Sequence, residues 1–195
     1  MILGAVLLLA ALSLFLRNRQ EDAQAAASVE ALLPQIHAQI AAAEAAAKTA
    51  AEDAAPPDPF DPTMTEIVID GYAYIGYLSV PSLGLELPVM SAWDETRLKI
   101  APCRYAGSTK SDDLVIAGHN YRRHFSPLKQ LVPGDAVYFF DMDGVCSAYE
   151  VVVLETLPPA AVEDMTAGAY DLTLFTCTYG GQNRFTVRCD RIETP

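Results

Sequence analysis

Residues 171–189 read DLTLFTCTYGGQNRFTVRC, and this stretch carries the clearest structural pattern in the chain. An apolar run ends at Cys177, a turn-forming segment rich in Gly and Asn follows, and a strand-like run resumes at Arg184. The pattern predicts a β-hairpin that brings the guanidinium of Arg184 back beside the thiol of Cys177. Alternation along the second strand puts Arg184 and Cys189 on opposite faces, which favours a core position for Cys189.

A second apolar run, residues 114–117, is followed by Gly118 and His119. A cysteine nucleophile needs a base that raises its thiolate fraction and an acid that protonates the leaving amine. An imidazole can do both, because it titrates near neutral pH. His119 is therefore the candidate partner of Cys177. Acyl transfer also builds negative charge on a carbonyl oxygen, which a fixed cation such as Arg184 can stabilise.

Other polar residues near these positions are given lesser roles. His124 is a rival base, but it lies in a polar, loop-like stretch and is expected at the surface. Arg188 and Arg191 are rival cations that lie further from the hairpin turn, and we expect them to be solvated or at the rim of the substrate site. Thr176 and Asn120 flank the candidate pair and are expected to line the substrate groove.

The chain beyond residue 62 has an all-β texture. Short runs rich in Val, Ile, Tyr and Phe alternate with Gly, Pro and Asp, which is typical of a sandwich or barrel. The expected strands cover residues 73–80, 85–90, 114–117, 136–141, 147–157, 171–176 and 184–189. Short helical turns are expected near residues 93–100 and 127–131.

The N-terminal end begins with an apolar run. Residues 2–16 read ILGAVLLLAALSLFL and are followed by two arginines. Their length lies between that of a membrane span and that of a signal peptide, so both interpretations stay open. The arginines follow the apolar run, opposite to the positive-inside rule for an exported domain. A basic leader upstream of Met1 is one hypothesis that would explain this.

Between the apolar run and the β-rich part, residues 20–55 are rich in Ala, Glu and Gln and predict a helical spacer. Residues 41–55 could equally form a frayed linker. The prolines of residues 56–62 end any helix. The expected organisation is an anchor or signal segment at 1–19, a helical spacer and Pro-rich linker at 20–62, and a catalytic β-barrel domain at 63–195.

Composition narrows the range of functions. A formal net charge of −12 argues against a nucleic-acid partner, because phosphate binding needs a basic face. The four cysteines form no CxxC pair and no histidine has metal-ligand spacing, so no zinc site or other cofactor is expected. Cys103 and Cys146 are expected to be small buried hydrophobic residues. Glu163 and Asp164 are too few carboxylates for calcium and are expected in a solvated turn.

The segment Thr173-Leu174-Phe175-Thr176-Cys177, with an Arg on the next strand and a Gly-His at an earlier strand end, resembles the signature of the sortase family. The resemblance runs from about residue 74 to residue 191 and includes GYLSVPSL at 76–83. It implies an all-β fold, an eight-stranded sortase-type β-barrel with short helices, preceded here by the membrane helix and the helical spacer. It also implies that Cys177 forms a thioacyl intermediate, His119 transfers protons, and Arg184 positions the substrate and stabilises the oxyanion.

Sortases of Gram-positive bacteria cut a sorting signal similar to Leu-Pro-x-Thr-Gly after its Thr and pass the acyl group to an amine. The resemblance therefore implies two partners, the sorting signal of a surface or pilin protein and an amine of the cell wall or a pilin. It also implies an extracytoplasmic catalytic domain at the cell membrane. A cysteine protease or amidase, which would pass the acyl group to water, and a non-catalytic surface binding domain are the competing interpretations.

The subclass stays open at this point. Residues 158–171 leave little room for the long added helix of class B sortases. Asp58-Pro59-Phe60 resembles the lid motif of class C enzymes, with Asp58 and Phe60 as the possible lid residues. A C-terminal membrane segment, common in class C, is not expected in a chain that ends at Pro195.

Overall fold

The computed structural model describes residues 2–50 and 61–193. The possible lid residues Asp58 and Phe60 lie outside these ranges. The described strands are β1 (Ile67–Ile69), β2 (Tyr72–Val80), β3 (Leu85–Met90), β4 (Cys103–Ala106), β5 (Leu114–Gly118), β6 (Ala136–Asp141), β7 (Cys146–Leu157), β8 (Leu172–Cys177) and β9 (Arg184–Ile192). The helices are α1 (Ile2–Ala50) and α2 (Val162–Thr166), with 3₁₀ turns η1 (Pro81–Leu83), η2 (Arg97–Lys99) and η3 (Ser126–Gln130).

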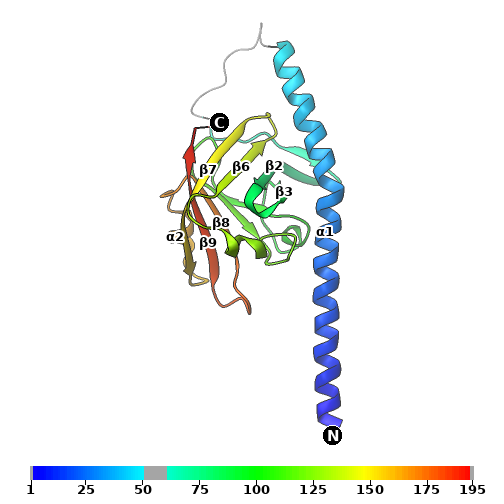
Figure 1. Ribbon diagram of the computed structural model, residues 1–195. Helices are drawn as coiled ribbons and strands as arrows, with labels where there is room; N and C mark the ends of the chain where they lie inside the picture. Colours follow the sequence, from blue (N-terminus) through cyan, green and yellow to red (C-terminus); the bar gives the residue numbers. More distant parts are fainter. Residues whose placement is uncertain (1, 51–60, 194–195) are drawn as a thin grey trace.

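Strands β2 to β9 close into an eight-stranded barrel, as predicted (Figure 1). Their order around the barrel is β2-β3-β4-β5-β8-β9-β7-β6, and β6 pairs back onto β2. The pairs β3–β4 and β5–β8 are parallel and the others are antiparallel. All seven expected strands are present. The short strands β1 and β4 were not expected, because three or four residues are too few to show a period.

Closure of the barrel depends on a bulge in β2. The pairing of β2 with β3 shifts between Tyr74 and Gly76, and β2 pairs with β6 from Gly76 onward. Gly76 has φ of 145°, and a Cβ there would lie 2.0 Å from the carbonyl oxygen of Phe140. Only glycine permits this approach, so the bulge lets β2 bend onto β6.

Helix α1 is one continuous helix that packs along the barrel (Figure 1). Its buried residues recur every three or four positions and face β2 and β3. They are Ala25, Val29, Leu32, Ile36 and Ile40, none more than 8% exposed. The expected spacer is therefore helical up to Ala50 and also forms part of the hydrophobic core.

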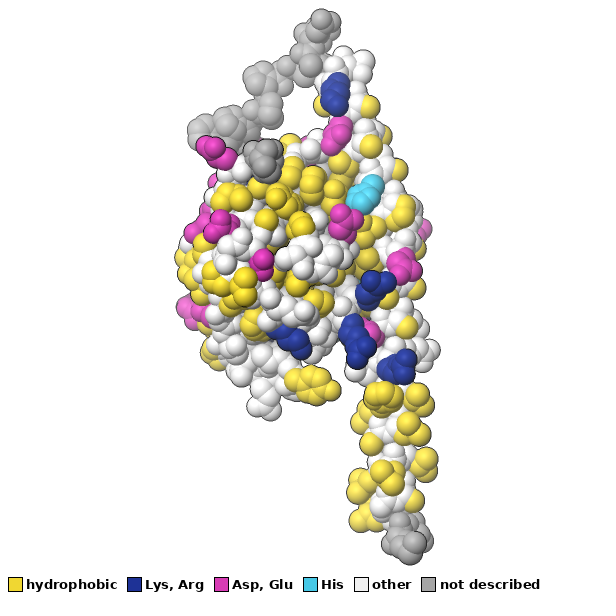
Figure 2. Space-filling model, in the orientation of Figure 1, with side chains coloured by type: hydrophobic (Ala, Val, Ile, Leu, Met, Phe, Trp, Pro, Cys, Tyr) yellow, Lys and Arg dark blue, Asp and Glu magenta, His cyan; other side chains and the backbone are white. Residues whose placement is uncertain are grey.

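The apolar start of α1 extends beyond the barrel, and Lys and Arg side chains gather near the boundary (Figure 2). By length and composition this part of α1 could cross a membrane, and none of it is buried in the protein. An unburied apolar helix is unfavourable in water, which suggests membrane anchoring.

Arg188 is 4% exposed, which corrects the expectation that it is solvated or at the rim of the substrate site. Its guanidinium donates to Glu155 Oε1 at 2.8 Å, to Thr173 Oγ1 at 3.0 Å and to the carbonyl of Asp164 in α2 at 2.8 Å. The short helix α2 packs over this face of β9, and the hydrogen bond from Arg188 to the carbonyl of Asp164 links α2 to the barrel. Arg191 lies near the C-terminal end of β9, away from Arg184 at the start of the strand, and its guanidinium pairs with Asp112 at 2.6 Å.

Candidate active site

Three neighbouring strands carry the candidate residues to one edge of the barrel. β5 and β8 are parallel, with Gly118 opposite Thr176. β8 and β9 are antiparallel, with Cys177 directly opposite Arg184. His119 follows Gly118 as Cys177 follows Thr176, so the β5–β8 register sets His119 beside Cys177. Cys177 and Arg184 are therefore paired across β8 and β9, and His119 lies one residue beyond the end of the neighbouring strand β5.

These side chains lie on the outer face of the barrel wall. Leu174 of β8 and Val187 of β9 belong to the interior cluster, and so does Cys189, which is fully buried. Cys177 and Arg184 alternate with these residues, so their side chains start from the opposite face. The predicted hairpin, its alternation and the core position of Cys189 are confirmed.

The other three cysteines are poor nucleophiles. Burial raises the pKa of the Cys103 thiol to about 12, and burial also raises the pKa of Cys189. Cys146 is half-buried, and partial burial together with the Asp141 carboxylate raises its pKa. A thiol with a raised pKa holds little thiolate at neutral pH. Cys177 is the half-buried cysteine that lines a cavity.

The guanidinium of Arg184 is directed to the β8–β9 connection. Its Nη1 donates to the carbonyls of Gly181 at 3.2 Å and Asn183 at 3.3 Å. Among the described residues Arg184 forms no ion pair with a carboxylate. An arginine carries five donors, so other N–H groups of Arg184 have no partner among the described residues, but neither Arg184 nor His119 lines the cavity that contains Cys177.

His119 is half-buried, and its Nε2 is buried with no hydrogen-bond partner in the described part of the chain. Burial lowers its pKa, Lys99 adds to this effect, and Glu95 and Glu21 oppose it. The imidazole is therefore mainly neutral at pH 7, with a nitrogen able to accept a proton.

His124 is fully buried, which corrects its expected surface position. The segment after β5 folds back on itself, with the backbone nitrogen of His124 donating to the carbonyl of Tyr121 at 3.1 Å. Neither ring nitrogen of His124 has a hydrogen-bond partner among the described residues. Burial, reinforced by His119, lowers the pKa of His124 to about 4. A residue this deep is a poor rival to His119 for contact with substrate.

We expect His124 to make the protein less stable in mild acid. Between pH 6.5 and 4 the unfolded chain protonates this histidine and the folded chain does not, so stability falls as the pH falls through this window. The loss is about 3 kcal/mol for a shift of this size. Denaturant unfolding at several pH values should show a shallower slope in this window for His124→Leu. An unchanged slope would contradict the buried, neutral state.

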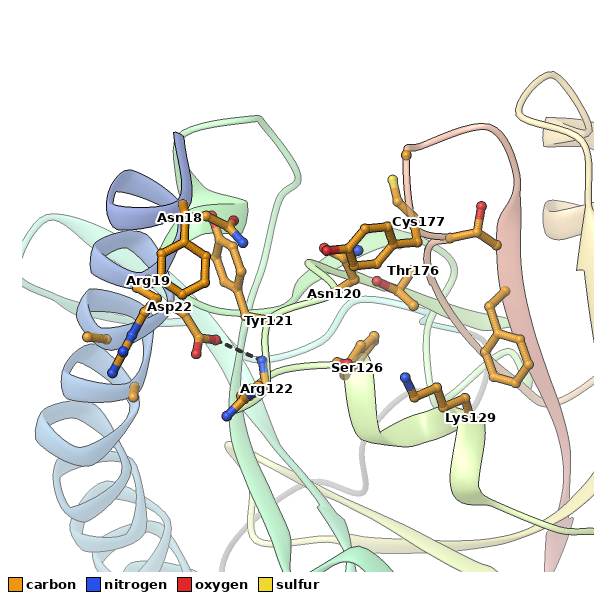
Figure 3. Close-up of a pocket in the computed structure, with 18 residues that line it drawn as sticks. Asn18, Arg19, Asp22, Asn120, Tyr121, Arg122, Ser126, Lys129, Thr176 and Cys177 are labelled. Carbon is orange, nitrogen blue, oxygen red and sulfur yellow. Dashed lines mark hydrogen bonds between the residues drawn. The ribbon is translucent and has the colours of Figure 1, made fainter. Parts of the chain in front are cut away.

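A cavity of about 1060 Å³ lies beside Cys177, between α1 and the β8–β9 connection (Figure 3). Its lining includes Thr176 and Asn120, as expected for a substrate groove. The hydroxyl oxygen of Thr176 is buried and has no hydrogen-bond partner among the described residues. Such an oxygen is available to a bound peptide.

The helix side of this cavity was not anticipated from the sequence. Phe15, Asn18, Arg19 and Asp22 of α1 line it, together with Lys129 of η3. Nothing local in the sequence of α1 marks these residues as part of a site. Leu32, Ile36 and Ile40 recur at helical spacing, which indicates that one face of α1 is buried but not which surface covers it.

Comparison with known proteins identifies the family of this chain. A model of the sortase domain matches residues 78–192, more than half of the chain. The chain belongs to the sortase family. Sortase A of Bacillus anthracis is 30% identical to this sortase over 149 residues, which is 68% of each protein.

Solved structures of class C sortases share the fold. Sortase C1 of Streptococcus suis superposes with a TM-score of 0.54 at 26% identity, covering 63% of this sortase and 74% of that chain. Sortase C-1 of Actinomyces oris superposes with a TM-score of 0.57 at 23% identity, covering 80% of this sortase and 99% of that chain. Sortases are cysteine transpeptidases, so this sortase is assigned to acyl transfer.

Proposed function

We propose that this sortase cleaves an LPxTG-like sorting signal through a thioacyl intermediate on Cys177 and transfers the acyl group to an amine of the cell wall or a pilin. The observation that carries the proposal is that His119 directly follows β5, Cys177 ends β8 and Arg184 begins β9, and these three strands are neighbours in the barrel. Membership of a transpeptidase family supports the reaction class.

The reaction runs in two halves. The thiol of Cys177 gives its proton to the neutral imidazole of His119 as its sulfur attacks the carbonyl carbon of the signal's Thr, and Arg184 stabilises the negative oxygen that forms. The C–N bond breaks as protonated His119 gives its proton to the leaving amine, leaving a thioester. The acceptor amine then attacks the thioester, His119 takes its proton, and the thiolate of Cys177 leaves.

The position of α1 supports an enzyme anchored by residues 2–16 with its cavity near the membrane surface; the proposal of an extracytoplasmic domain is based on the sortase family, because Arg17 and Arg19 follow the apolar run. The cavity beside Cys177 begins at Phe15, close to the end of the apolar run. A substrate held at the outer membrane surface, and an acceptor in the wall, would both meet the enzyme there.

A panel of sorting-signal peptides, incubated with several amine acceptors and analysed by mass spectrometry, tests this function. We expect an amide-linked product with the amine present and an acyl mass on the peptide that contains Cys177 without it. Hydrolysis alone, with no transfer to any amine, would instead indicate a protease or amidase. Peptide binding without adduct or product would indicate a binding domain.

A further inference from the structure

The segment that follows His119 is tied to helix α1 by three consecutive residues. Each of them bonds to a carboxylate of the helix. The bonds are Tyr121 hydroxyl to Glu21 Oε2 at 3.4 Å, Arg122 backbone nitrogen to Asp22 Oδ1 at 2.8 Å, and Arg123 Nη2 to Glu30 Oε1 at 3.1 Å. These contacts join parts of the chain about a hundred residues apart, so they are specific to the docked helix.

The three ties differ in burial. The Tyr121–Glu21 bond is part-buried, since Tyr121 is 8% exposed and Glu21 is half-buried, so solvent screens it only in part; the bond from the Arg122 backbone to Asp22 is exposed but short, at 2.8 Å. Arg123 and Glu30 are exposed, and an exposed ion pair of this kind contributes little. Glu21 and Asp22 are therefore the two that hold the segment.

Tyr121 packs against the ring of His119, so the bond between Tyr121 and Glu21 also restrains the imidazole. The two rings lie 4.7 Å apart at 31°, and the hydroxyl end of Tyr121 is the end that bonds to Glu21. From the other side, the backbone nitrogen of Phe125 donates to the carbonyl of His119 at 3.0 Å. The His119 imidazole is thus held by packing, because its Nε2 has no hydrogen bond to a described residue.

Helix α1 also forms a wall of the cavity that contains Cys177. Asn18, Arg19 and Asp22 stand on one side in Figure 3, and Thr176 and Cys177 stand on the other. The Asp22 carboxylate that lines this wall is the one that holds the backbone of Arg122 (Figure 3). A peptide that reaches Cys177 through this cavity must pass along α1.

We propose that helix α1 is part of the active site. Glu21 and Asp22 are positioning residues that hold His119 through Tyr121 and Arg122. The substrate peptide binds against the residues of α1 that line the cavity. This inference rests on the proposed transpeptidase function. Its physical basis is that a misplacement of a reacting group by about 1 Å costs on the order of a hundredfold in rate.

The positioning role is tested with the full chain in detergent. We expect Asp22→Ala, which removes the acceptor for Arg122, to lower kcat about tenfold or more; KM is also expected to rise, because Asp22 lines the cavity wall. Asp22→Asn keeps an acceptor oxygen and should restore most of kcat. Glu30→Ala is the matched control, because it removes a helix carboxylate bonded to the same segment without lining the cavity, and should change kcat less than twofold.

The pKa of His119, measured by NMR of the labelled imidazole, gives a readout that needs no turnover. Glu21→Gln keeps a hydrogen-bond acceptor for Tyr121 but removes a charge that raises this pKa, so the pKa should fall. Normal kcat in Asp22→Ala would overturn the positioning role, and an unchanged pKa in Glu21→Gln would show that the charge of Glu21 does not act on His119. If the wild-type protein is inactive but Glu21→Gln still lowers the pKa of His119, only the transpeptidase function is overturned.

The substrate wall is tested by filling it. Ala23 lines the cavity, whereas the neighbouring Gln24 is exposed and does not line it. Ala23→Trp should raise KM for peptide at least about fivefold, while iodoacetamide, which is much smaller, still alkylates Cys177 at the wild-type rate. Gln24→Trp should leave both unchanged. Equal peptide KM values for the two variants would show that substrate does not pass along α1.

Discussion

Replacing Cys177 by Ala is expected to reduce transpeptidation by about 10⁴-fold or more, to the uncatalysed background. The nucleophile is lost, and no other cysteine replaces it, because Cys103 and Cys189 are buried with raised pKa values. His119→Ala should lose comparable activity, since neither proton transfer then has a partner. Product formation and thioacyl mass, both followed by mass spectrometry, provide the measurement.

Cys146→Ala is the matched control for this experiment. Cys146 is also half-buried but lies at the start of β7, which pairs with β6 and β9. We expect its replacement to leave turnover unchanged. If Cys177→Ala still accumulates an acyl adduct, the nucleophile has been assigned to the wrong residue.

Replacing Arg184 by Ala is expected to lower kcat by about 10² to 10³-fold, the usual effect of removing one oxyanion donor. Thermal unfolding should barely change, because within residues 2–50 and 61–193 the guanidinium bonds only to carbonyls of the β8–β9 connection. Arg184→Lys keeps the charge without the planar fork and should recover only part of the rate.

Arg123→Ala serves as the control for the loss of a positive charge, because Arg123 is exposed and does not line the cavity. It should retain near-normal turnover. Near-normal rates in Arg184→Ala would place oxyanion stabilisation in other groups, such as backbone amides near Cys177.

The hairpin that ends at Cys189 could be predicted from the sequence alone, whereas the position of His119 could not. The two-residue period of a strand and the turn chemistry of Gly180 and Gly181 are local properties, so they predicted the Cys177–Arg184 pair directly. His119 beside Cys177 required more, because parallel strands pair across the whole fold. There the resemblance to sortases supplied what periodicity could not.

His124 and Arg188 show where sequence patterns fail. Both are polar, and polar residues are mostly exposed, so each was expected at or near the surface. Their burial depends on segments distant in sequence: α2 covers Arg188, and the β3–β4 connection, through Ile100, lies beside His124. No pattern around either residue records which segment will cover it.

The sequence by itself determined seven of the nine described strands, the alternation of their faces and the strand ends next to the candidate nucleophile, base and cation, because these depend on neighbours a few residues apart. Only the tertiary structure decided that α1 lies against the barrel, that Glu21 and Asp22 reach the segment after His119, and that one wall of the cavity is helical. Those contacts join residues about a hundred positions apart. Which segments meet is set by closure of the barrel and burial of the apolar stripe on α1, and both are properties of the whole chain.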